Sequence, residues 1–428
     1  MSGNERRSLV PRLRFPEFRD AGEWITVELG KLSRLLTERV GSTTCTPYTI
    51  ISGVGLISQE EKLGRTIAGN SLKNYLVLQY NDFAYNKSAT KAYPQGFIAL
   101  YTGDERAAVP NSIFTCFRVN QNQAIPTFLD ALFTSNLHGK WLRARIAVGA
   151  RAHGSLQVSD DDLMTTPVPL PNGTSSLEEQ QKIADSLSSL DDLIAAETQK
   201  LDTLKTHKKG LMQQLFPCEG ETVPRLRFLE FREAAEWEEK ALGQLGELVS
   251  GLTYSPDDVR DEGLLVLRSS NVQDGSIVLD NNVYVRPDIK GASPSLPNDI
   301  LICVRNGSKS LIGKNALIPK GMPPCTHGAF MTVFRSSAAK FIIQLFQTEA
   351  YEKQVVADLG ATINSINGNK LKKYKFLVPE PEEQQVIADC LSSLDDLITA
   401  QSQKIEALKT HKKSLMQQLF PVLDEVSA

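Results

Sequence analysis

Apolar residues recur at alternating steps of four and three over two long stretches of the chain, 172–217 and 382–421. Such steps keep a narrow apolar stripe on one face of an α-helix, which is the heptad seam of a coiled coil. Ser176 with Glu179 three residues later has the pattern of a capping box, and Pro381 suits a first helical turn. We therefore predict two long helices with the seam residues Ile183, Leu187, Leu190, Ile194, Leu201, Leu204, Ile387, Leu391, Leu394, Ile398, Ile405 and Leu408.

The two helical stretches are copies of one another. Residues 178–217 return as 382–421 with 31 of 40 positions identical. A second repeat lies ahead of each copy, because VPRLRFPEFRDAGEW at 10–24 returns as VPRLRFLEFREAAEW at 223–237. Internal repeats of this kind mark structural units. The sequence therefore predicts two half-molecules in tandem.

An apolar stripe needs a partner, and the second copy is the natural partner of the first. Connectivity favours antiparallel pairing, because a parallel pair would force the intervening body to bridge a helix length of roughly 50 Å. Polar residues interrupt both seams at matching positions, where they can fix register and partner. These residues are Glu197 and Lys208 in the first copy and Gln401 and Lys412 in the second. The alternative is that each helix packs on its own body as an ordinary amphipathic helix.

Two stretches with little mutual identity, 25–171 and 238–381, lie between the repeats. Both carry short β-branched or aromatic runs separated by Gly, Pro and Asn, with helical stretches at 126–146 and 341–359. The predicted fold class is α+β: two globular α/β domains separated by two long helices that pair as an antiparallel coiled coil, with internal pseudo-two-fold symmetry. The predicted segments are 1–24 completing the pseudo-symmetric circle, the first globular domain 25–171, the helical spacer 172–217, the linker 218–237 that repeats the N-terminal segment, the second globular domain 238–381, the helical spacer 382–421 and the tail 422–428.

Composition limits the classes of function. The 428 residues carry a formal net charge of -3, and a chain that bound DNA by electrostatics alone would usually be more basic. The six cysteines are scattered without a CxxC pair, which argues against a zinc site or a disulfide framework and fits a reducing cytoplasm. The sequence shows neither an apolar run near the roughly 18 residues that span a bilayer nor the apolar core of a signal peptide. We expect a cytoplasmic protein with no membrane contact.

Polar turns within the two variable bodies are the candidates for nucleic-acid contacts. Asn can pair with the adenine edge and Arg with guanine, while Lys and Ser mostly hold phosphates. For each residue the alternative is a solvated turn side chain. The sequence shows no nucleophile–base pair, no metal-ligand cluster and no Gly-rich cofactor turn, so we expect no catalytic or metal site. The candidates are Asn86, Lys87, Ser88, Lys91, Arg151, His153, Ser155, Gln157, Arg305, Asn306, Ser308, Lys309, Lys314, Asn364, Ser365, Asn367, Asn369 and Lys370.

The order of these segments is similar to that of a known family. A variable body, a helix of the form EEQQxIAD…LDDLI…LMQQLFP, a second variable body and a second such helix together resemble the DNA-specificity subunit of type I restriction-modification enzymes, over about 10–421. The resemblance rests on EEQQ at 178–181 and 382–385, after Pro-rich strand ends, and on GATINSIN at 360–367. The first body departs from the last motif and reads GARAHGSLQ at 149–157.

The resemblance implies a division of labour between subunits. Each variable body would be a target recognition domain reading one half of a bipartite, asymmetric site in double-stranded DNA, and the coiled coil would set the gap. The chain itself would be non-catalytic and bind no cofactor. Two methyltransferase subunits would modify adenines with S-adenosylmethionine, and two motor-nuclease subunits would restrict DNA with ATP and Mg. The competing hypothesis is a coiled-coil assembly scaffold whose bodies bind only proteins. A third hypothesis is that the chain is the specificity subunit of a single partner enzyme that both cuts and modifies DNA.

Overall fold

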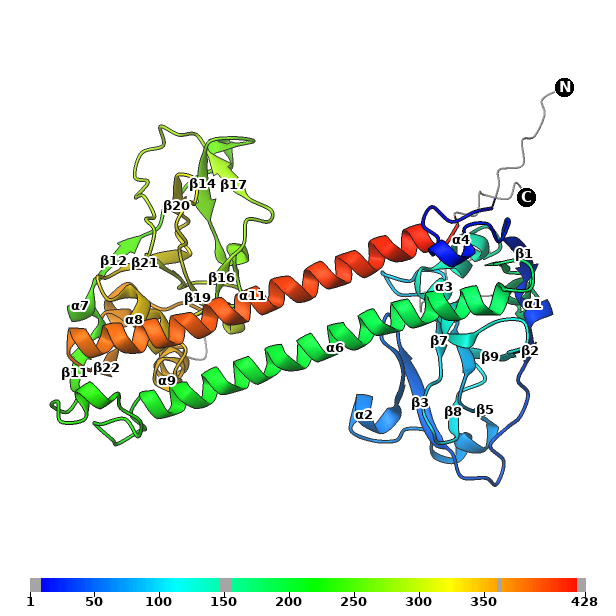
Figure 1. The fold of residues 1–428 in the computed structure, drawn as a ribbon. Helices are drawn as coiled ribbons and strands as arrows, with labels where there is room; N and C mark the ends of the chain where they lie inside the picture. Colours follow the sequence, from blue (N-terminus) through cyan, green and yellow to red (C-terminus); the bar gives the residue numbers. More distant parts are fainter. Residues whose placement is uncertain (1–8, 147–155, 157, 360–363, 422–428) are drawn as a thin grey trace. The chain divides into compact units, whose positions relative to one another are not determined.

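Two long helices, α6 (Ser176–Leu215) and α11 (Pro381–Leu419), are drawn in green and orange-red in Figure 1. The computed structural model describes residues 9–146, 156, 158–359 and 364–421. It divides into two compact units, each with one globular body and part of each long helix. Both bodies mix strands and helices, which confirms the predicted mixture of α and β structure. Unit 1 comprises Met1–Glu197 and Lys404–Ala428, and unit 2 comprises Thr198–Gln403.

The body of unit 1 contains two four-stranded sheets. The first has the order β2 (Ser33–Leu35), β9 (Phe114–Val119), β6 (Asp82–Asn86) and β7 (Phe97–Leu100), and all its neighbours are antiparallel. The second has the order β4 (Gly55–Ser58), β3 (Thr46–Ile51), β8 (Ala107–Val109) and β5 (Leu76–Leu78), in which β3 and β8 are parallel. The remaining elements are the pair β1 (Ile25–Glu28) and β10 (Pro167–Leu170), the helices α1 (Leu29–Leu32), α2 (Gln59–Leu63), α3 (Pro126–Thr134), α4 (Leu137–Arg143) and α5 (Asp160–Met164), and the 3-10 turns Pro16–Phe18 and Gly69–Asn74.

The body of unit 2 also contains two four-stranded sheets, and the first of them repeats the arrangement seen in unit 1. Its first sheet has the order β12 (Glu247–Ser250), β21 (Met331–Arg335), β18 (Ile300–Cys303) and β19 (Asn315–Leu317), again with antiparallel neighbours. Its second has the order β13 (Val259–Arg260), β17 (Val283–Val285), β14 (Leu264–Leu267) and β20 (Cys325–His327), in which β14 and β20 are parallel. The remaining elements are the pairs β11 (Glu238–Ala241) with β22 (Lys375–Val378) and β15 (Val272–Gln273) with β16 (Ser276–Ile277), the helices α7 (Leu242–Leu245), α8 (Ala339–Leu345), α9 (Glu349–Asp358) and α10 (Gly368–Leu371), and the 3-10 turns Leu229–Phe231, Pro256–Asp258, Ser269–Asn271 and Lys309–Leu311.

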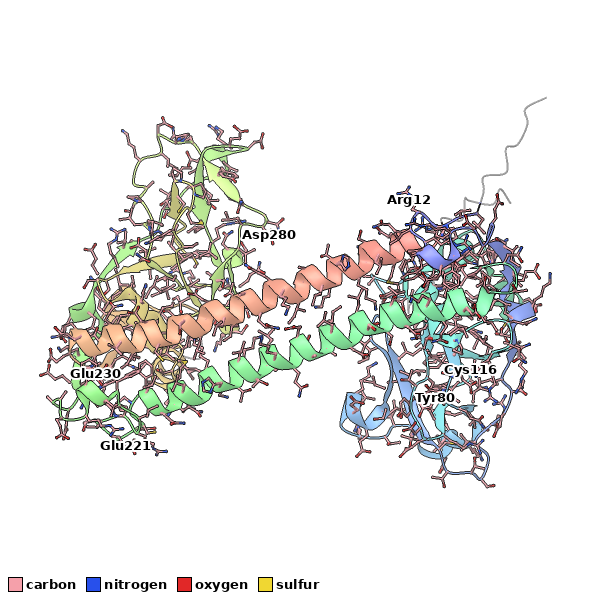
Figure 2. The ribbon with its side chains drawn as sticks, in the orientation of Figure 1. Arg12, Tyr80, Cys116, Glu221, Glu230 and Asp280 are labelled. Carbon is pink, nitrogen blue, oxygen red and sulfur yellow. The ribbon has the colours of Figure 1, made fainter. Side chains whose placement is uncertain are left out.

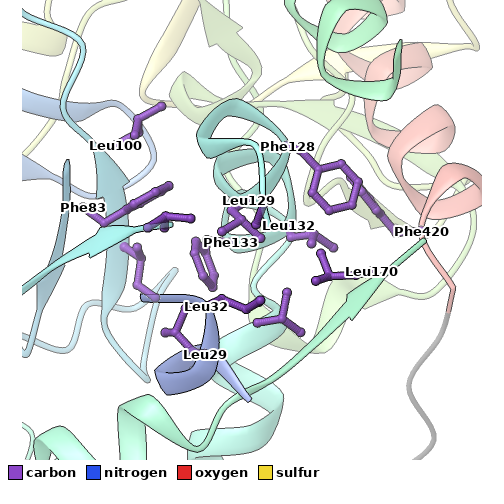
Figure 3. Close-up of a cluster of buried hydrophobic side chains, with 14 of the residues drawn as sticks. Leu29, Leu32, Phe83, Leu100, Phe128, Leu129, Leu132, Phe133, Leu170 and Phe420 are labelled. Atoms are coloured by element: carbon purple, nitrogen blue, oxygen red, sulfur yellow. The ribbon is translucent and has the colours of Figure 1, made fainter. Parts of the chain in front are cut away.

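The core of unit 1 takes side chains from both long helices. Ile183 enters it from the first turns of α6, and Leu419 and Phe420 enter it from the end of α11. Phe128 of α3 packs edge-on against Phe420, with ring centroids 5.5 Å apart, as the close-up of this core shows (Figure 3). The ring centroid of Phe128 also lies 5.9 Å from that of Trp24.

The core of unit 2 has the reciprocal arrangement. Ile387 enters from the first turns of α11, and Phe216 enters from the end of α6. The Phe216 ring lies 5.6 Å from that of Phe341 in α8 and 5.9 Å from that of Trp237. Because each core receives the start of one repeat helix and the end of the other, the alternative that each helix packs only on its own body is wrong.

The repeated PRLRF segments make the same contacts within each unit. In both, a backbone N–H of the segment donates to a carbonyl at the end of one long helix. An arginine of the segment forms a bidentate ion pair with a buried glutamate at the start of the other long helix. These contacts are Leu13 N to Gln418 O and Leu226 N to Gln214 O, both 2.9 Å, and Arg14 Nε to Glu179 and Arg227 Nε to Glu383, both 2.8 Å.

The predicted seam residues are all buried or half-buried. The buried ones lie mainly where the long helices meet a body, and the half-buried ones lie between. The buried residues are Ile183, Leu187, Ile387, Leu391 and Ile405, and the half-buried ones are Leu190, Ile194, Leu201, Leu204, Leu394, Ile398 and Leu408.

In unit 1, ion pairs link the two long helices. Lys412 Nζ lies 2.5 and 2.7 Å from the two carboxylate oxygens of Asp191, and Lys404 Nζ lies 2.5 Å from Glu197 Oε1. Partner numbers fall along α11 as they rise along α6, so the two segments are antiparallel within this unit. One polar seam residue, Lys412, thus has a carboxylate on the facing helix.

In unit 2, Lys208 is the corresponding polar seam residue, and it is buried. Its ammonium group donates to Asp395 Oδ1 at 2.6 Å and to Gln347 Oε1 at 2.8 Å. Gln344 Nε2 donates to the other Asp395 oxygen at 2.8 Å. Because a buried ammonium group is costly without partners, this network specifies where Asp395 lies against α6.

Three local predictions are wrong. The helix predicted at 126–146 breaks after Thr134, where Asn136 is left-handed with φ 64°, and the one predicted at 341–359 breaks at 346–348. Ser135 and Thr348 stand at these breaks, and each hydroxyl donates to the carbonyl three residues earlier, which competes with helix continuation. The capping box is absent because Ser176 Oγ donates to Pro171 O at 2.6 Å while Arg14 binds the Glu179 carboxylate.

Candidate nucleic-acid interface

A buried aspartate fixes the start of the strand β6 in unit 1. Asp82 is fully buried and accepts hydrogen bonds from Arg118 Nε and Nη2 at 2.6 and 2.8 Å. It also accepts from the Gln79 backbone N–H at 2.7 Å and follows Asn81, whose φ is 69°. Hydrogen bonding to Asp82 raises the pKa of Arg118 above its ordinary value. These hydrogen bonds of Asp82, which we call the Asp–Arg lock, set the register of β6 against β9.

Unit 2 has the same lock at the start of β18. Asp299 accepts from Arg335 Nε and Nη2 at 2.9 and 2.8 Å and from the Leu296 backbone N–H at 2.7 Å. Asn298 before it has φ 68°, so the turn geometry is also repeated. The Asp299 hydrogen bonds raise the pKa of Arg335. In both bodies the locked strand leads directly into a loop that contains candidate contact residues.

The loop 304–314 joins β18 to β19 in unit 2 and holds five of these candidates. Its base is closed by Cys303 N to Lys314 O and Gly313 N to Cys303 O, both 2.8 Å. The Asn306 side chain shapes its first turn, donating to Ser269 Oγ at 3.0 Å and accepting from Ser308 N at 3.0 Å. Arg305, Ser308, Lys309 and Lys314 are exposed, and Asn306 is half-buried.

A second segment, distant in sequence, joins this loop. Ser365 forms an isolated antiparallel bridge with Arg305, and Asn364 Nδ2 donates to Gly307 O at 3.1 Å. Ile366 N also donates to Val304 O at 2.8 Å. The structure therefore brings the candidates at 305–309 and 364–365 into one surface, which we call the unit 2 loop site.

The candidates on α10 are mostly committed to structural contacts. Asn367 caps this helix by accepting from Asn369 N at 2.8 Å. Lys370 Nζ lies 2.7 Å from Asp358 Oδ1. Asn369 is exposed. The geometry therefore favours local roles for Asn367 and Lys370.

The corresponding loop of unit 1 follows β6. Asn86 is only 9% exposed, and its side-chain oxygen accepts from Ser88 N at 3.0 Å, so its amide shapes the loop and is poorly placed for a base. Lys87 and Ser88 are half-buried, and Lys87 Nζ lies 3.4 Å from Asp160 Oδ1. Lys91 is exposed. The remaining candidates of this body, Arg151, His153, Ser155 and Gln157, lie outside the described residues.

Sequence reasoning missed one prominent side chain of the unit 2 loop site. Phe330 is 56% exposed and directly precedes β21, and the Arg305 guanidinium lies 5.7 Å from its ring centroid. Phe330 belongs to the strand-like run 329–336, but the strand β21 begins only at Met331 and leaves Phe330 outside it. An exposed aromatic residue beside polar turns is a feature of nucleic-acid sites that the run itself did not signal.

The buried histidines of the described residues make local structural contacts. Burial lowers the pKa of His138 to about 4, and its ring contacts the Gly96 carbonyl at 3.2 Å. His327 is held between Ser295 and the Val249 carbonyl, and its pKa is also lowered by burial. All six cysteines are free, and Cys116 lies inside the unit 1 body (Figure 2). Within the described ranges there is neither a cluster of three or more His, Cys, Asp or Glu suited to a metal nor a helix long and apolar enough to cross a membrane.

Comparison with known proteins gives consistent results. The family model for the type I restriction modification DNA specificity domain matches residues 64–206 and 234–410. Two proteins of Methanocaldococcus jannaschii are each 25% identical: the putative type I restriction enzyme MjaX specificity subunit, over 76% of this chain and 74% of its own length, and the MjaVIII specificity subunit, over 72% of both.

Two solved structures share the fold. The S subunit of a type I restriction-modification system from M. genitalium has a TM-score of 0.57 at 15% identity, covering 97% of this chain and 100% of its own. A chain from a study of complex assembly and conformational transition in a type I R-M system has a TM-score of 0.51 at 18% identity, covering 93% and 97%.

Proposed function

We propose, because the chain belongs to the type I restriction modification DNA specificity family, that its two bodies read the two halves of a bipartite, asymmetric DNA site. DNA sequence specificity is the role of this family, and its chains are non-catalytic because catalysis resides in partner subunits. The family model matches both halves of the chain, which agrees with one recognition domain in each.

One observation supports the proposal that each body reads its own half-site: the two bodies share a framework of strands but differ in the loops that follow it. Both bodies have the same strand order in their first sheet and the same Asp–Arg lock at the start of an inner strand of that sheet. The loops that follow differ: unit 1 has the half-buried Lys87 and Ser88 where unit 2 has the half-buried Val304 and the exposed Arg305. Side chains that reach base edges determine sequence preference, so unlike loops on like frames would read unlike sequences.

The two long helices would set the gap between the half-sites by pairing along their length as an antiparallel coiled coil. The reciprocal ion pairs of Lys412 with Asp191 and of Lys208 with Asp395 support this, because each is made by the same repeat positions. Removing four residues from one helix would shorten it by about 6 Å. The gap in the recognised site should then change while both half-sites stay the same; altered half-sites would contradict the ruler role.

Two copies of one partner would bind the repeated helix starts. Glu178, Gln181 and Asp185 are exposed, and their copies Glu382, Gln385 and Asp389 are also exposed and identical. Core packing does not constrain exposed positions, so their identity is explained by contact with the same partner twice. We propose two methyltransferase subunits that use S-adenosylmethionine, with two motor-nuclease subunits that use ATP and Mg joining for restriction in the cytoplasm.

Footprinting with the methyltransferase partner present tests the function. We expect protection of two short tracts of double-stranded DNA with an unprotected gap between them, and methylated adenines within the protected site. An assembly scaffold would leave DNA unprotected at every salt concentration. Exchanging residues 25–171 for those of another family member should change one half-site only, which also assigns each half-site to its body; loss of both half-sites would contradict modular reading.

A further inference from the structure

Phe330 is an exposed aromatic ring on a rigid support. Its carbonyl accepts from both Val304 N at 3.0 Å and Arg305 N at 3.1 Å, and the next residue, Met331, begins β21. The backbone at Phe330 is therefore fixed to the base of the loop 304–314. A single exposed apolar residue is common on protein surfaces, so its meaning depends on its neighbours.

The neighbour of this ring is the guanidinium group of Arg305. Arg305 lies with its guanidinium carbon 5.7 Å from the Phe330 ring centroid. No ion pair of Arg305 is recorded within the described part of the chain, whereas Lys87 and Lys370 each have an aspartate partner there. An aromatic face holds a guanidinium plane in place while leaving its N–H donors available.

Unit 1 lacks both members of this pair at the matching positions. Lys87 N donates to Ile113 O at 2.9 Å, as Val304 N donates to Phe330 O, so Ile113 stands in the place of Phe330. The residue after Lys87 is Ser88, where unit 2 has Arg305. The frame is shared and the pair is not, which is the distribution expected of residues that distinguish one half-site from the other.

We propose that Arg305 and Phe330 are specificity-determining residues of the unit 2 body: Arg305 reads a guanine and Phe330 packs on the methyl group of a thymine next to it. Arginine can donate two hydrogen bonds to guanine O6 and N7, and phenylalanine makes apolar contact with the thymine methyl in the major groove. The proposal rests on the DNA-reading function proposed above and names the side chains that perform it in this body.

The test uses the full chain with its methyltransferase partner and DNA that carries the mapped site. Arg305→Lys keeps the charge but loses the paired donors, so discrimination for guanine at one position should fall about 10-fold or more. Phe330→Ala should remove the preference for thymine at the neighbouring position, whereas Phe330→Leu should keep part of it. Replacing that thymine by uracil removes one methyl group and should weaken wild-type binding about 3- to 5-fold. The same replacement should leave Phe330→Ala binding unchanged.

Two controls distinguish a failure of this residue assignment from a failure of the proposed DNA-reading function. The half-site read by unit 1 should keep its full discrimination in the Arg305 and Phe330 variants, which also shows that the protein is folded. Ile113→Ala, at the matching position of unit 1, should leave the unit 2 half-site unchanged. Unchanged base preferences in Arg305→Lys and Phe330→Ala would overturn the proposal, as would a uniform loss on all sequences, since that indicates a phosphate contact. Failure of the wild-type complex to protect any DNA would overturn the proposed function itself.

Discussion

The two bodies hold their central strand in the same way and differ in what they present beyond it. Asp82 and Asp299 are buried carboxylates, each bound by an arginine from the neighbouring strand and by a backbone N–H of the preceding turn. A few residues further on, unit 1 has a half-buried Ser88 and unit 2 an exposed Arg305 on an aromatic ring. Strong internal contacts thus preserve the frame, and the loops remain able to vary without loss of the fold.

The largest effect should follow from breaking the lock of unit 2. Asp299→Ala removes a buried carboxylate that accepts from the half-buried Arg335 guanidinium and from the Leu296 N–H, so the free energy of unfolding should fall by about 4 kcal/mol. Urea unfolding of the full chain measures this. The matched control is Glu247→Gln, because Glu247 is exposed and reaches Arg335 only at 3.7 Å; this variant should unfold like the wild type. Equal effects of the two substitutions would show that the lock does not hold the frame.

The next largest effect should be a difference in stability between substitutions of the arginines in the two repeated segments, Arg14 and Arg227. Arg14 and Arg227 each pair with a buried glutamate, but Glu179 also accepts from Trp24 Nε1 at 3.3 Å, whereas Trp237 Nε1 has no recorded partner. Arg227→Ala therefore leaves Glu383 with no recorded side-chain donor within the described residues. We expect it to cost about 3 kcal/mol, and Arg14→Ala about 1 kcal/mol less.

Calorimetric melting of the two variants measures this difference. Replacing Trp24 by Phe in the Arg14→Ala background removes the remaining donor and should make the two units equally sensitive. If Arg14→Ala is already the more harmful change, the hydrogen bond of Trp24 to Glu179 does not contribute to stability.

How far the sequence predicted these features depends on the range of the contacts. The heptad stripe predicted helices at 172–217 and 382–421 because the signal is local and repeated, and α6 and α11 end within two residues of the predicted C-terminal bounds. The break at Asn136 was missed because one hydroxyl bond and one left-handed residue outweigh a continuing apolar pattern. The bond from Asn364 to Gly307 and the exposure of Phe330 depend on where distant strands meet, which no local pattern encodes.

A smaller effect should appear in the pH dependence of unit 1. Burial lowers the pKa of His138 from its ordinary 6.5 to about 4, so between these values the unfolded chain binds a proton that the folded chain does not. Stability from this group is complete above pH 6.5 and is lost as the pH falls toward 4, by about 2 kcal/mol between pH 7 and pH 5. His138→Phe should remove this loss, measured by unfolding at both pH values.

Asp130 in the same body changes the stability of the protein in the opposite direction as the pH falls. Burial raises its pKa to about 6, so the folded chain binds a proton before the unfolded chain does, and its contribution grows as the pH falls below 6. Asp130→Asn should therefore steepen the loss on acidification that His138 causes. A wild-type profile as steep as that of Asp130→Asn would show that this carboxyl is not shifted in the folded protein.

The smallest effect should come from two exposed lysines, one in each of the two loops. Lys91 and Lys314 are exposed and have no recorded carboxylate partner within the described ranges, so each is suited to a phosphate and not to a base. Lys91→Ala and Lys314→Ala should each lower affinity for DNA by less than about 10-fold, equally for all sequences, and reduce the slope of log affinity against log salt by about 1. Titrations of the methyltransferase complex at several salt concentrations measure both quantities. A change in base preference in either variant would show that the lysine contacts a base. The distinction between residues that bind phosphates and the base-reading pair Arg305 and Phe330 would then be wrong.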